Sequence, residues 1–185
     1  MSGVAQARRA AVIGLAMLLA ASLLMLLLPV AARAADAPLK RIVMLDFELI
    51  DPTLDRASDE AQRERLKKIS SLLRQQFIDK GFYQVLDTAP QQAMVDDLKS
   101  RFKLYDCNGC EIDIGRALGA DRVMTAWVQK VSNLILNINI QINDVATGEP
   151  VLNKSVDIRG NTDLSWERGI RYMVRSMEEK GQGNR

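Results

Sequence analysis

Hydrophobic and polar positions follow two different periods along this chain. In the first half, apolar residues recur every three or four positions, which is typical of helices that bury one face. This spacing predicts helices over 58–80 and 90–102, and a short helix that ends near Leu118. The nearly continuous apolar run 41–49 predicts a buried strand covered on both faces, and 82–87 predicts a second, shorter strand.

The predicted helix 58–80 carries the clearest apolar stripe of the first half. The residues of this stripe are Leu66, Ile69, Leu73 and Phe77. Gly81 fits the left-handed position that ends such a helix. Further along, Gly115 fits close packing of the short helix, and Gly119 fits its end.

The second half of the chain changes to the period of a strand. After a predicted strand at 121–130, the segment 134–143 places apolar side chains on one face and amides on the other. The apolar residues are Leu134, Leu136, Ile138, Ile140 and Ile142, and the amides are Asn137, Asn139, Gln141 and Asn143. A strand at 151–158 and a final helix from Asp163 follow. The apolar stripe of that helix is Trp166, Ile170, Met173, Val174 and Met177.

The order of these elements is strand, helix, strand, helix, short helix, three strands and a final helix. We assign this order to the α+β class, as an α/β sandwich. Strands joined by helices are expected to be parallel, whereas strands joined by tight turns are antiparallel. We therefore expect one mixed sheet with helices packed on it, parallel in its first half and an antiparallel meander in its second half.

Residues 1–34 have the composition of a secretory signal peptide. A short basic start precedes an apolar run over 10–32, and a small-x-small cleavage site ends at Ala34. We expect cleavage there and a periplasmic or secreted single domain, 35–185, with its ordered core at about 40–180. No other run is long enough for a membrane span. The run itself is long enough to remain as an uncleaved anchor, and this alternative stays open.

Charge and composition narrow the classes of function. Cleavage removes Arg8, Arg9 and Arg33 and no acidic residue, so the net charge changes from +2 to −1. A near-neutral chain lacks the excess of positive charge that is typical of nucleic-acid-binding proteins. The chain has no His, which excludes Ser-His and Cys-His nucleophile pairs. We find no catalytic constellation, and we expect neither a cofactor nor a metal.

Cys107 and Cys110 are the only cysteines, and they form a Cys-x-x-Cys motif. In an oxidising compartment we expect them to pair as a structural disulfide that pins the connection before the short helix. The alternatives are a metal ligand pair and a redox-active dithiol with Cys107 as the nucleophile. The preceding segment is polar and helical, whereas a thioredoxin-type site follows a central strand, so the structural interpretation is favoured.

Two polar groups are candidate binding sites. Asp46, Glu48, Asp51 and Asp55 follow the first strand, where open α/β sheets often bind ligands, and they predict a pocket for a cation or a basic ligand. The alternative is a solvated loop with turn-forming acids. The ladder of Asn137, Asn139 and Gln141 predicts a docking surface, because amides form hydrogen bonds without the desolvation of a charge. Its alternative is a sheet face in contact with water.

Three short segments resemble those of known envelope domains. They are Ile42-Val-Met-Leu-Asp-Phe47, Gly115-Arg-Ala-Leu-Gly-Ala-Asp-Arg-Val-Met124 and Asp144-Val-Ala-Thr-Gly148. They are similar to the first strand, the short helix before a strand, and the hairpin turn of CsgG-type curli-secretion lipoproteins and of the TolB amino-terminal domain. The similarity in element order spans about residues 40–180 and implies a fold, which by itself carries no function.

Three further segments resemble a family of secreted proteobacterial domains of unknown function. They are Cys107-Asn-Gly-Cys110, Val128-Gln-Lys-Val-Ser-Asn-Leu134 and Gly160-Asn-Thr-Asp-Leu-Ser-Trp166. This family offers no established activity. We expect a non-enzymatic periplasmic binding or assembly accessory with an envelope or periplasmic protein partner. A thiol-disulfide redox protein and a periplasmic small-molecule sensor are the alternatives.

Overall fold

The centre of the molecule is a mixed six-stranded sheet. The computed structural model describes residues 38–53 and 59–183. The strands are β1 (Arg41–Met44), β2 (Glu48–Ile50), β3 (Gln84–Leu86), β4 (Arg122–Lys130), β5 (Ile135–Asp144) and β6 (Pro150–Arg159). Their order across the sheet is β3-β1-β4-β5-β6, and β2 also pairs with β4.

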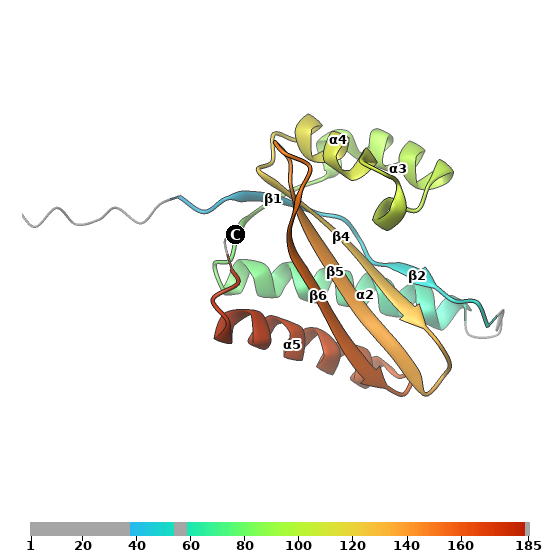
Figure 1. Ribbon diagram of the computed structural model, residues 1–185. Helices are drawn as coiled ribbons and strands as arrows, with labels where there is room; N and C mark the ends of the chain where they lie inside the picture. The colour runs from blue at the N-terminus through green and yellow to red at the C-terminus, as the bar shows by residue number, and fades with distance from the viewer. Residues whose placement is uncertain (1–37, 54–58, 184–185) are drawn as a thin grey trace, which may run out of the picture. The chain divides into compact units, whose positions relative to one another are not determined.

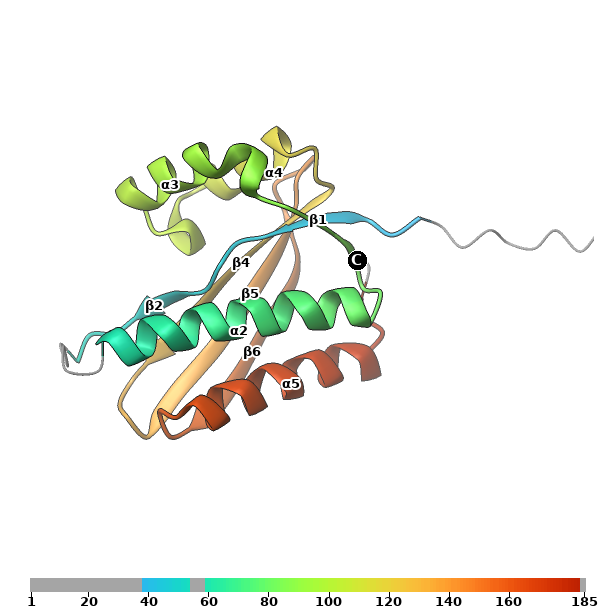
Figure 2. The same ribbon diagram turned by 180° about the vertical axis from the view of Figure 1, so that it is seen from behind.

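Helices lie on both faces of this sheet. They are α2 (Asp59–Asp79), α3 (Gln92–Arg101), α4 (Cys110–Ala117) and α5 (Asp163–Glu179), and the 3₁₀ turns η2 (Ala89–Gln91) and η3 (Leu104–Asp106) flank α3. Figure 2 shows α2 and α5 side by side in front of the strands. Figure 1 shows α3 and α4 on the opposite side, over one end of the sheet only.

The strand pairing confirms the predicted α+β class and the mixed sheet. β1 is parallel to both β3 and β4, and β2 is parallel to β4. β4, β5 and β6 form an antiparallel meander. The parallel strands are joined through helices and the antiparallel strands through short turns, as chain geometry requires.

The run 41–49 forms β1 and β2, so the prediction of one continuous strand is wrong. The side chain of Asp46 is exposed at the break. Beside it, the N–H of Phe47 donates to Oγ of Ser70 on α2, with N and Oγ 2.9 Å apart. Because a buried N–H needs a partner, this side chain satisfies the backbone where strand pairing is interrupted.

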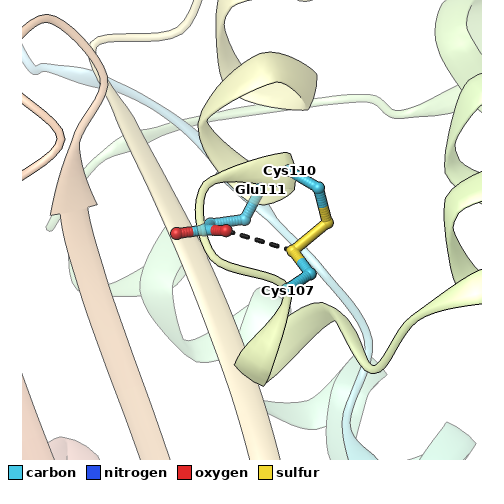
Figure 3. A group of neighbouring side chains, drawn as sticks. All are labelled: Cys107, Cys110 and Glu111. Atoms are coloured by element: carbon cyan, nitrogen blue, oxygen red, sulfur yellow. Dashed lines mark hydrogen bonds between the residues drawn. A yellow bond between two sulfur atoms is a disulfide. The ribbon is translucent and has the colours of Figure 1, made fainter.

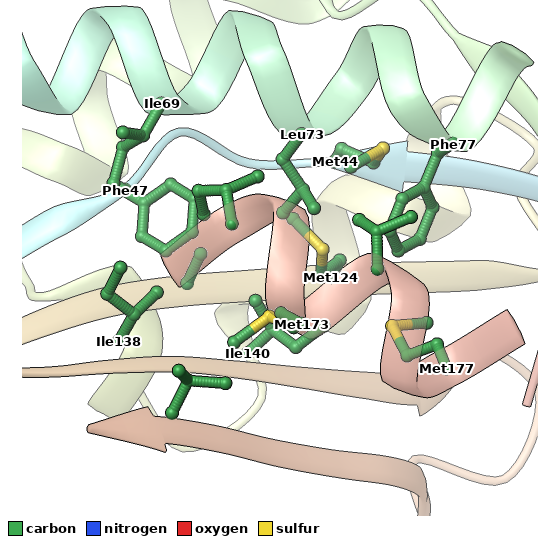
Figure 4. Close-up of a cluster of buried hydrophobic side chains, with 14 of the residues drawn as sticks. Met44, Phe47, Ile69, Leu73, Phe77, Met124, Ile138, Ile140, Met173 and Met177 are labelled. Atoms are coloured by element: carbon green, nitrogen blue, oxygen red, sulfur yellow. The ribbon is translucent and has the colours of Figure 1, made fainter. Parts of the chain in front are cut away.

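The sheet separates two hydrophobic cores. The larger core lies between the sheet and the helix pair α2 and α5, and Figure 4 shows its central side chains. Ile69, Leu73 and Phe77 of the predicted α2 stripe are buried there, and Leu66 packs against them. The predicted α5 stripe is buried in full, with Trp166, Ile170, Met173, Val174 and Met177. The smaller core lies beneath α3 and α4, around Val123.

Two glycines determine how closely helices approach the sheet. A Cβ atom on Gly115 of α4 would lie 2.7 Å from Cγ2 of Val145, which confirms the predicted close packing. A Cβ atom on Gly169 of α5 would lie 2.7 Å from Cδ1 of Ile138 and from Cγ2 of Ile158. Real side chains do not approach this closely, so a larger residue at either position would force the neighbouring side chains to shift.

The predicted signal peptide, 1–34, lies outside the described residues, and its cleavage stays a prediction. None of the helices within the described part of the chain combines the length and the apolar character that crossing a bilayer requires. The structural account therefore concerns the unit Pro38–Arg185.

Candidate functional site

One face of the sheet carries mostly polar side chains from β4, β5 and β6, and we call it the amide face. It consists of Thr125, Trp127, Gln129, Asn137, Asn139, Gln141, Asn143, Ser155 and Asp157. Across the strands, Trp127 lies opposite Asn139, and Asn139 lies opposite Ser155. Because alternate residues of a strand point to opposite sides, the predicted amide ladder faces away from the larger core.

One end of the amide face is covered and the other end is open. Figure 1 shows α3 and α4 over one end, and the described helices leave the β4–β5 hairpin end clear on this side. Thr125 and Asn143 at the covered end are buried, whereas Asn139 is half-buried. At the hairpin end, Val131 beside the end of β4 and Ile135 of β5 have the same odd parity as the amides, and they expose 57% and 43% of their surface. The open end therefore combines neutral amides with exposed apolar side chains.

An aromatic pair borders the amide face. The ring of Tyr105 in η3 stacks on Trp127, with ring centroids 5.4 Å apart and planes at 28°. The backbone N–H of Tyr105 donates to Oε2 of Glu48, with N and Oε2 3.1 Å apart, and this holds η3 against β2. Burial raises the pKa of Glu48, and burial together with the nearby Glu48 and Asp106 carboxylates raises the pKa of Tyr105. Glu48 thus positions the aromatic pair.

Hydrogen bonds hold the open amides in defined orientations. Nδ2 of Asn137 donates to Oδ1 of Asp157, and the Ser155 hydroxyl donates to Oδ1 of Asn137 at 2.9 Å. Nδ2 of Asn139 donates to the backbone oxygen of Asn137 at 3.3 Å. A surface whose side chains are already ordered loses less conformational entropy when it binds.

A second chain of hydrogen bonds connects the amide face to the cysteine turn. Nε2 of Gln141 donates to Oδ1 of Asn143 at 2.9 Å, and Nδ2 of Asn143 donates to Oε1 of Glu111 at 3.1 Å. The other Glu111 oxygen accepts from the N–H of Gly109 at 3.1 Å and lies 3.2 Å from Sγ of Cys107 (Figure 3). Glu111 therefore joins the turn before α4 to the covered end of the sheet.

Cys107 and Cys110 are bonded to each other at the start of α4, with Cα atoms 5.5 Å apart. Whether this disulfide is structural or redox-active stays a prediction. The two Sγ atoms and a carboxylate oxygen of Glu111 lie within 4.8 Å of one another. Bonded sulfurs are not the thiolates that bind zinc, and these three residues supply one ligand fewer than a structural zinc site uses.

The other predicted acids contact separate partners. Asp46 forms an ion pair with Arg74 of α2 at 3.2 Å. Asp51 accepts from Nζ of the buried Lys130 at 2.8 Å. Burial alone raises the pKa of Asp51, but hydrogen bonds, the strongest of them from Lys130, outweigh this effect and lower the pKa to about 2. Asp55 lies outside the described residues. Among the described acids, Asp46, Glu48 and Asp51 therefore each contact a different element.

Sequence reasoning did not identify the stacked pair of Tyr105 and Trp127. A signal for Trp127 was present, because it alternates with Ala126 and Val128, which face the larger core. Tyr105 carries no comparable signal, since it belongs to a short 3₁₀ turn. Its place over the sheet depends on the contact of that turn with Glu48.

Comparison with protein families matches residues 40–177 to the family DUF3280, which is described as "Protein of unknown function (DUF2380)". No curated protein matches the chain. The family match agrees with the expectation that the chain belongs to a family of unknown function.

Several solved structures are similar to this one. The LpoB C-terminal domain from Escherichia coli is 15% identical, with 64% of this chain and 82% of that chain covered and a TM-score of 0.46. The lipoprotein GNA1162 from Neisseria meningitidis is 14% identical, with 77% of this chain and 95% of that chain covered and a TM-score of 0.46. TolB from Acinetobacter baumannii is 9% identical, with 78% of this chain and 29% of that chain covered and a TM-score of 0.44. At these identities the likeness concerns the fold alone.

Proposed function

Because this chain belongs to the family DUF3280, whose function is unknown, we propose a function from the surface that its own fold leaves open. The protein is a non-enzymatic accessory of the cell envelope that binds a partner protein through the amide face. The predicted signal peptide supports a location in the periplasm or outside the cell.

The open end of the amide face is the observation that carries this proposal. Neutral amides such as Asn137 and Asn139 offer both donors and acceptors, and burying them costs less than burying a charge. Beside them, Val131 and Ile135 expose apolar surface that a partner would bury. Exposed apolar side chains rimmed by polar groups are typical of interaction surfaces.

The stacked pair of Tyr105 and Trp127 supports a protein partner in particular. Tyrosine and tryptophan are enriched among the residues that dominate the affinity of protein interfaces. Glu48 holds the turn that carries Tyr105, so the aromatic pair has a fixed position beside the amides. An anchor that is rigid before binding loses little entropy on association.

The two alternative functions have less support. A redox dithiol needs a stabilised thiolate, but the Glu111 carboxylate lies 3.2 Å from Sγ of Cys107 and disfavours an anion there. A sensor for a basic ligand needs converging acids, but Asp46 and Asp51 are paired with different residues. Partner binding is the function that the arranged side chains favour.

Site-directed photo-cross-linking tests the proposal in living cells. A photoreactive residue replaces Asn139 on the amide face, and the matched control replaces the exposed Ser71 on α2. We expect a discrete protein adduct from position 139 and none from position 71. The purified partner is then titrated against the wild type and the Asn137→Arg variant, which should bind at least about tenfold more weakly, as expected for a central interface position.

Two results would contradict this proposal. Equal adducts at positions 139 and 71 would show that the cross-linking reports collisions and not a docking surface. A partner whose affinity is unchanged by Asn137→Arg would show that binding occurs elsewhere on the molecule.

A further inference from the structure

The outer edge of β6 is a long strand edge that is not paired with any strand in the described part of the chain. β6 is 10 residues long, whereas β3 at the other end of the strand order has 3 residues. A free edge of this length presents a row of backbone donors and acceptors that can pair with a further strand.

Hydrogen bonds at the sheet ends show which residues of β6 face outward. The N–H of Val131 donates to the oxygen of Ile135 at 3.0 Å, so odd-numbered residues of β5 bond to β4. The N–H of Gly160 donates to the oxygen of Leu134 at 3.1 Å, so even-numbered residues bond between β5 and β6. The N–H and C=O groups of the odd-numbered residues of β6, including Asp157, therefore point to the free edge.

One half of this edge carries protection against pairing. Pro150 begins the strand, and Lys154 points inward, where Nζ donates to Oγ of Ser176 at 2.8 Å and to Oε1 of Gln182 at 3.1 Å. Prolines and inward-pointing charges are devices that discourage the addition of another strand. The half from Ser155 to Arg159 has neither a proline nor an inward-pointing charge, and its charged residues, Asp157 and Arg159, are exposed on the opposite face of the strand.

A groove runs beside the unprotected half, between β6 and α5. Its volume is about 670 Å³. Its β6 side includes Val156 and Ile158, and its α5 side carries Leu164, Arg168 and Tyr172 at successive turns of the helix. Leu164 and Tyr172 expose 56% and 53% of their surface. Figure 1 shows α5 alongside β6, so a strand added to the edge would lie against this helix.

The charge of the α5 side indicates the kind of occupant. Arg168 lines the groove and has no ion-pair partner among the described residues, whereas Arg175, one turn beyond Tyr172, forms an ion pair with Glu179 at 3.9 Å. A second copy of this chain, added across a two-fold axis, would bring a second unpaired Arg168 to the same edge. An acidic segment would instead neutralise Arg168.

We propose that an extended segment of a partner protein adds as a strand to Ser155–Arg159 of β6, with an acidic side chain on Arg168 and apolar side chains on Leu164 and Tyr172. Backbone hydrogen bonds supply affinity and the alternate side chains supply specificity, as in other cases of strand addition. Ser155 and Asp157 belong both to this edge and to the amide face, but strand addition uses the backbone of β6 and the side chains of α5, so the proposal does not depend on binding at the amide face.

The test uses the full chain and a labelled synthetic peptide, Thr-Val-Thr-Glu-Thr-Val-Thr, with both ends blocked. Binding is followed by fluorescence anisotropy against the wild type and against Arg168→Glu. The matched control is Arg171→Glu, which reverses a charge on the same helix outside the groove. We expect Arg168→Glu to weaken binding at least about tenfold and Arg171→Glu to change it less than about twofold.

A second peptide tests the strand pairing without altering the protein. It carries N-methyl groups on the backbone nitrogens that would face β6, which removes those donors and should weaken binding at least about tenfold. A peptide with Lys in place of Glu should bind Arg168→Glu better than it binds the wild type.

Three outcomes would overturn the proposal. The first is that the Glu peptide does not bind the wild type. The second is binding that N-methylation leaves unchanged, which would indicate a charged patch without strand pairing. The third is a dimer in sedimentation that dissociates with Arg168→Glu, which would make a second copy the occupant of the edge.

Discussion

Along β5, neighbouring residues enter opposite environments. Ile138 and Ile140 face α2 and α5 and are buried, whereas Asn137 and Asn139 face the open side and are half-buried. Both sets belong to the same strand and share the same backbone pairing. The difference between the two faces is therefore made by side chains, and it separates the face that stabilises the sheet from the face that is available for binding.

The largest contrast between the faces is expected from two adjacent substitutions. Ile138→Ala opens a cavity in the larger core and should lower the free energy of unfolding by roughly 2–5 kcal/mol. Asn139→Thr, on the open face, should change it by no more than about 0.5 kcal/mol. Chemical denaturation of both variants measures the difference. Equal losses would mean that the amides are buried in an interface, and no loss from either variant would mean that the register is wrong.

A pair of serines tests the same contrast with a smaller effect. Ser70→Ala removes the hydroxyl that accepts from the buried N–H of Phe47, so it should lower the free energy of unfolding by about 1–3 kcal/mol. Ser155→Ala removes an exposed hydroxyl that donates to Asn137 and should cost less than about 0.5 kcal/mol. Thermal unfolding of both variants is the measurement. A loss from Ser155→Ala as large as that from Ser70→Ala would contradict the distinction between the faces.

Lys130 is a cation on the buried side of the sheet, and its pairing with Asp51 makes stability depend on pH. In the folded protein the pKa of Asp51 is lowered from 3.8 to about 2. The ionised carboxylate therefore contributes to the free energy of unfolding above pH 3.8, and this contribution is lost as the pH falls through 2. The pKa shift corresponds to about 2 kcal/mol of that free energy. Between pH 5 and pH 2, we therefore expect the wild type to lose about 2 kcal/mol more stability than Asp51→Asn.

Denaturation of the wild type and of Asp51→Asn at each pH measures this difference. Asp46→Asn is the control, because Asp46 is exposed and its ion pair with Arg74 lies at the surface. Identical pH profiles for the wild type and Asp51→Asn would show that the ion pair with Lys130 does not contribute in this range.

The smallest effect is expected where the covered end of the amide face meets the disulfide. After reduction, the Glu111 carboxylate should disfavour the Cys107 thiolate, which is the form that reacts with alkylating agents, so Glu111→Gln should increase the rate at which Cys107 is alkylated at about pH 7. Alkylation of the reduced protein measures this rate, and Asp113→Asn on the same helix is the control. An unchanged rate in Glu111→Gln would remove this argument against a redox role.

The site was only partly predictable from the sequence, because its residues come from separate segments. The amide ladder of β5 was visible as a strict alternation within one strand. The connection of Glu48 through Tyr105 to Trp127 was not visible, since it joins β2, η3 and β4. The prediction that Asp46, Glu48 and Asp51 share a pocket relied on their closeness in sequence, whereas each side chain contacts a different element.

Local sequence determined which segments became helices and strands and which face of each became apolar. These properties depend on neighbouring residues, as the buried stripes of α2 and α5 and the two faces of β5 show. Only the tertiary structure decided that 41–49 divides at Phe47 and that β6 has a free edge beside α5. The physical reason is that a backbone N–H donates to whichever acceptor the packed chain brings to it. That partner belongs to a distant part of the sequence, whose position the local pattern does not specify.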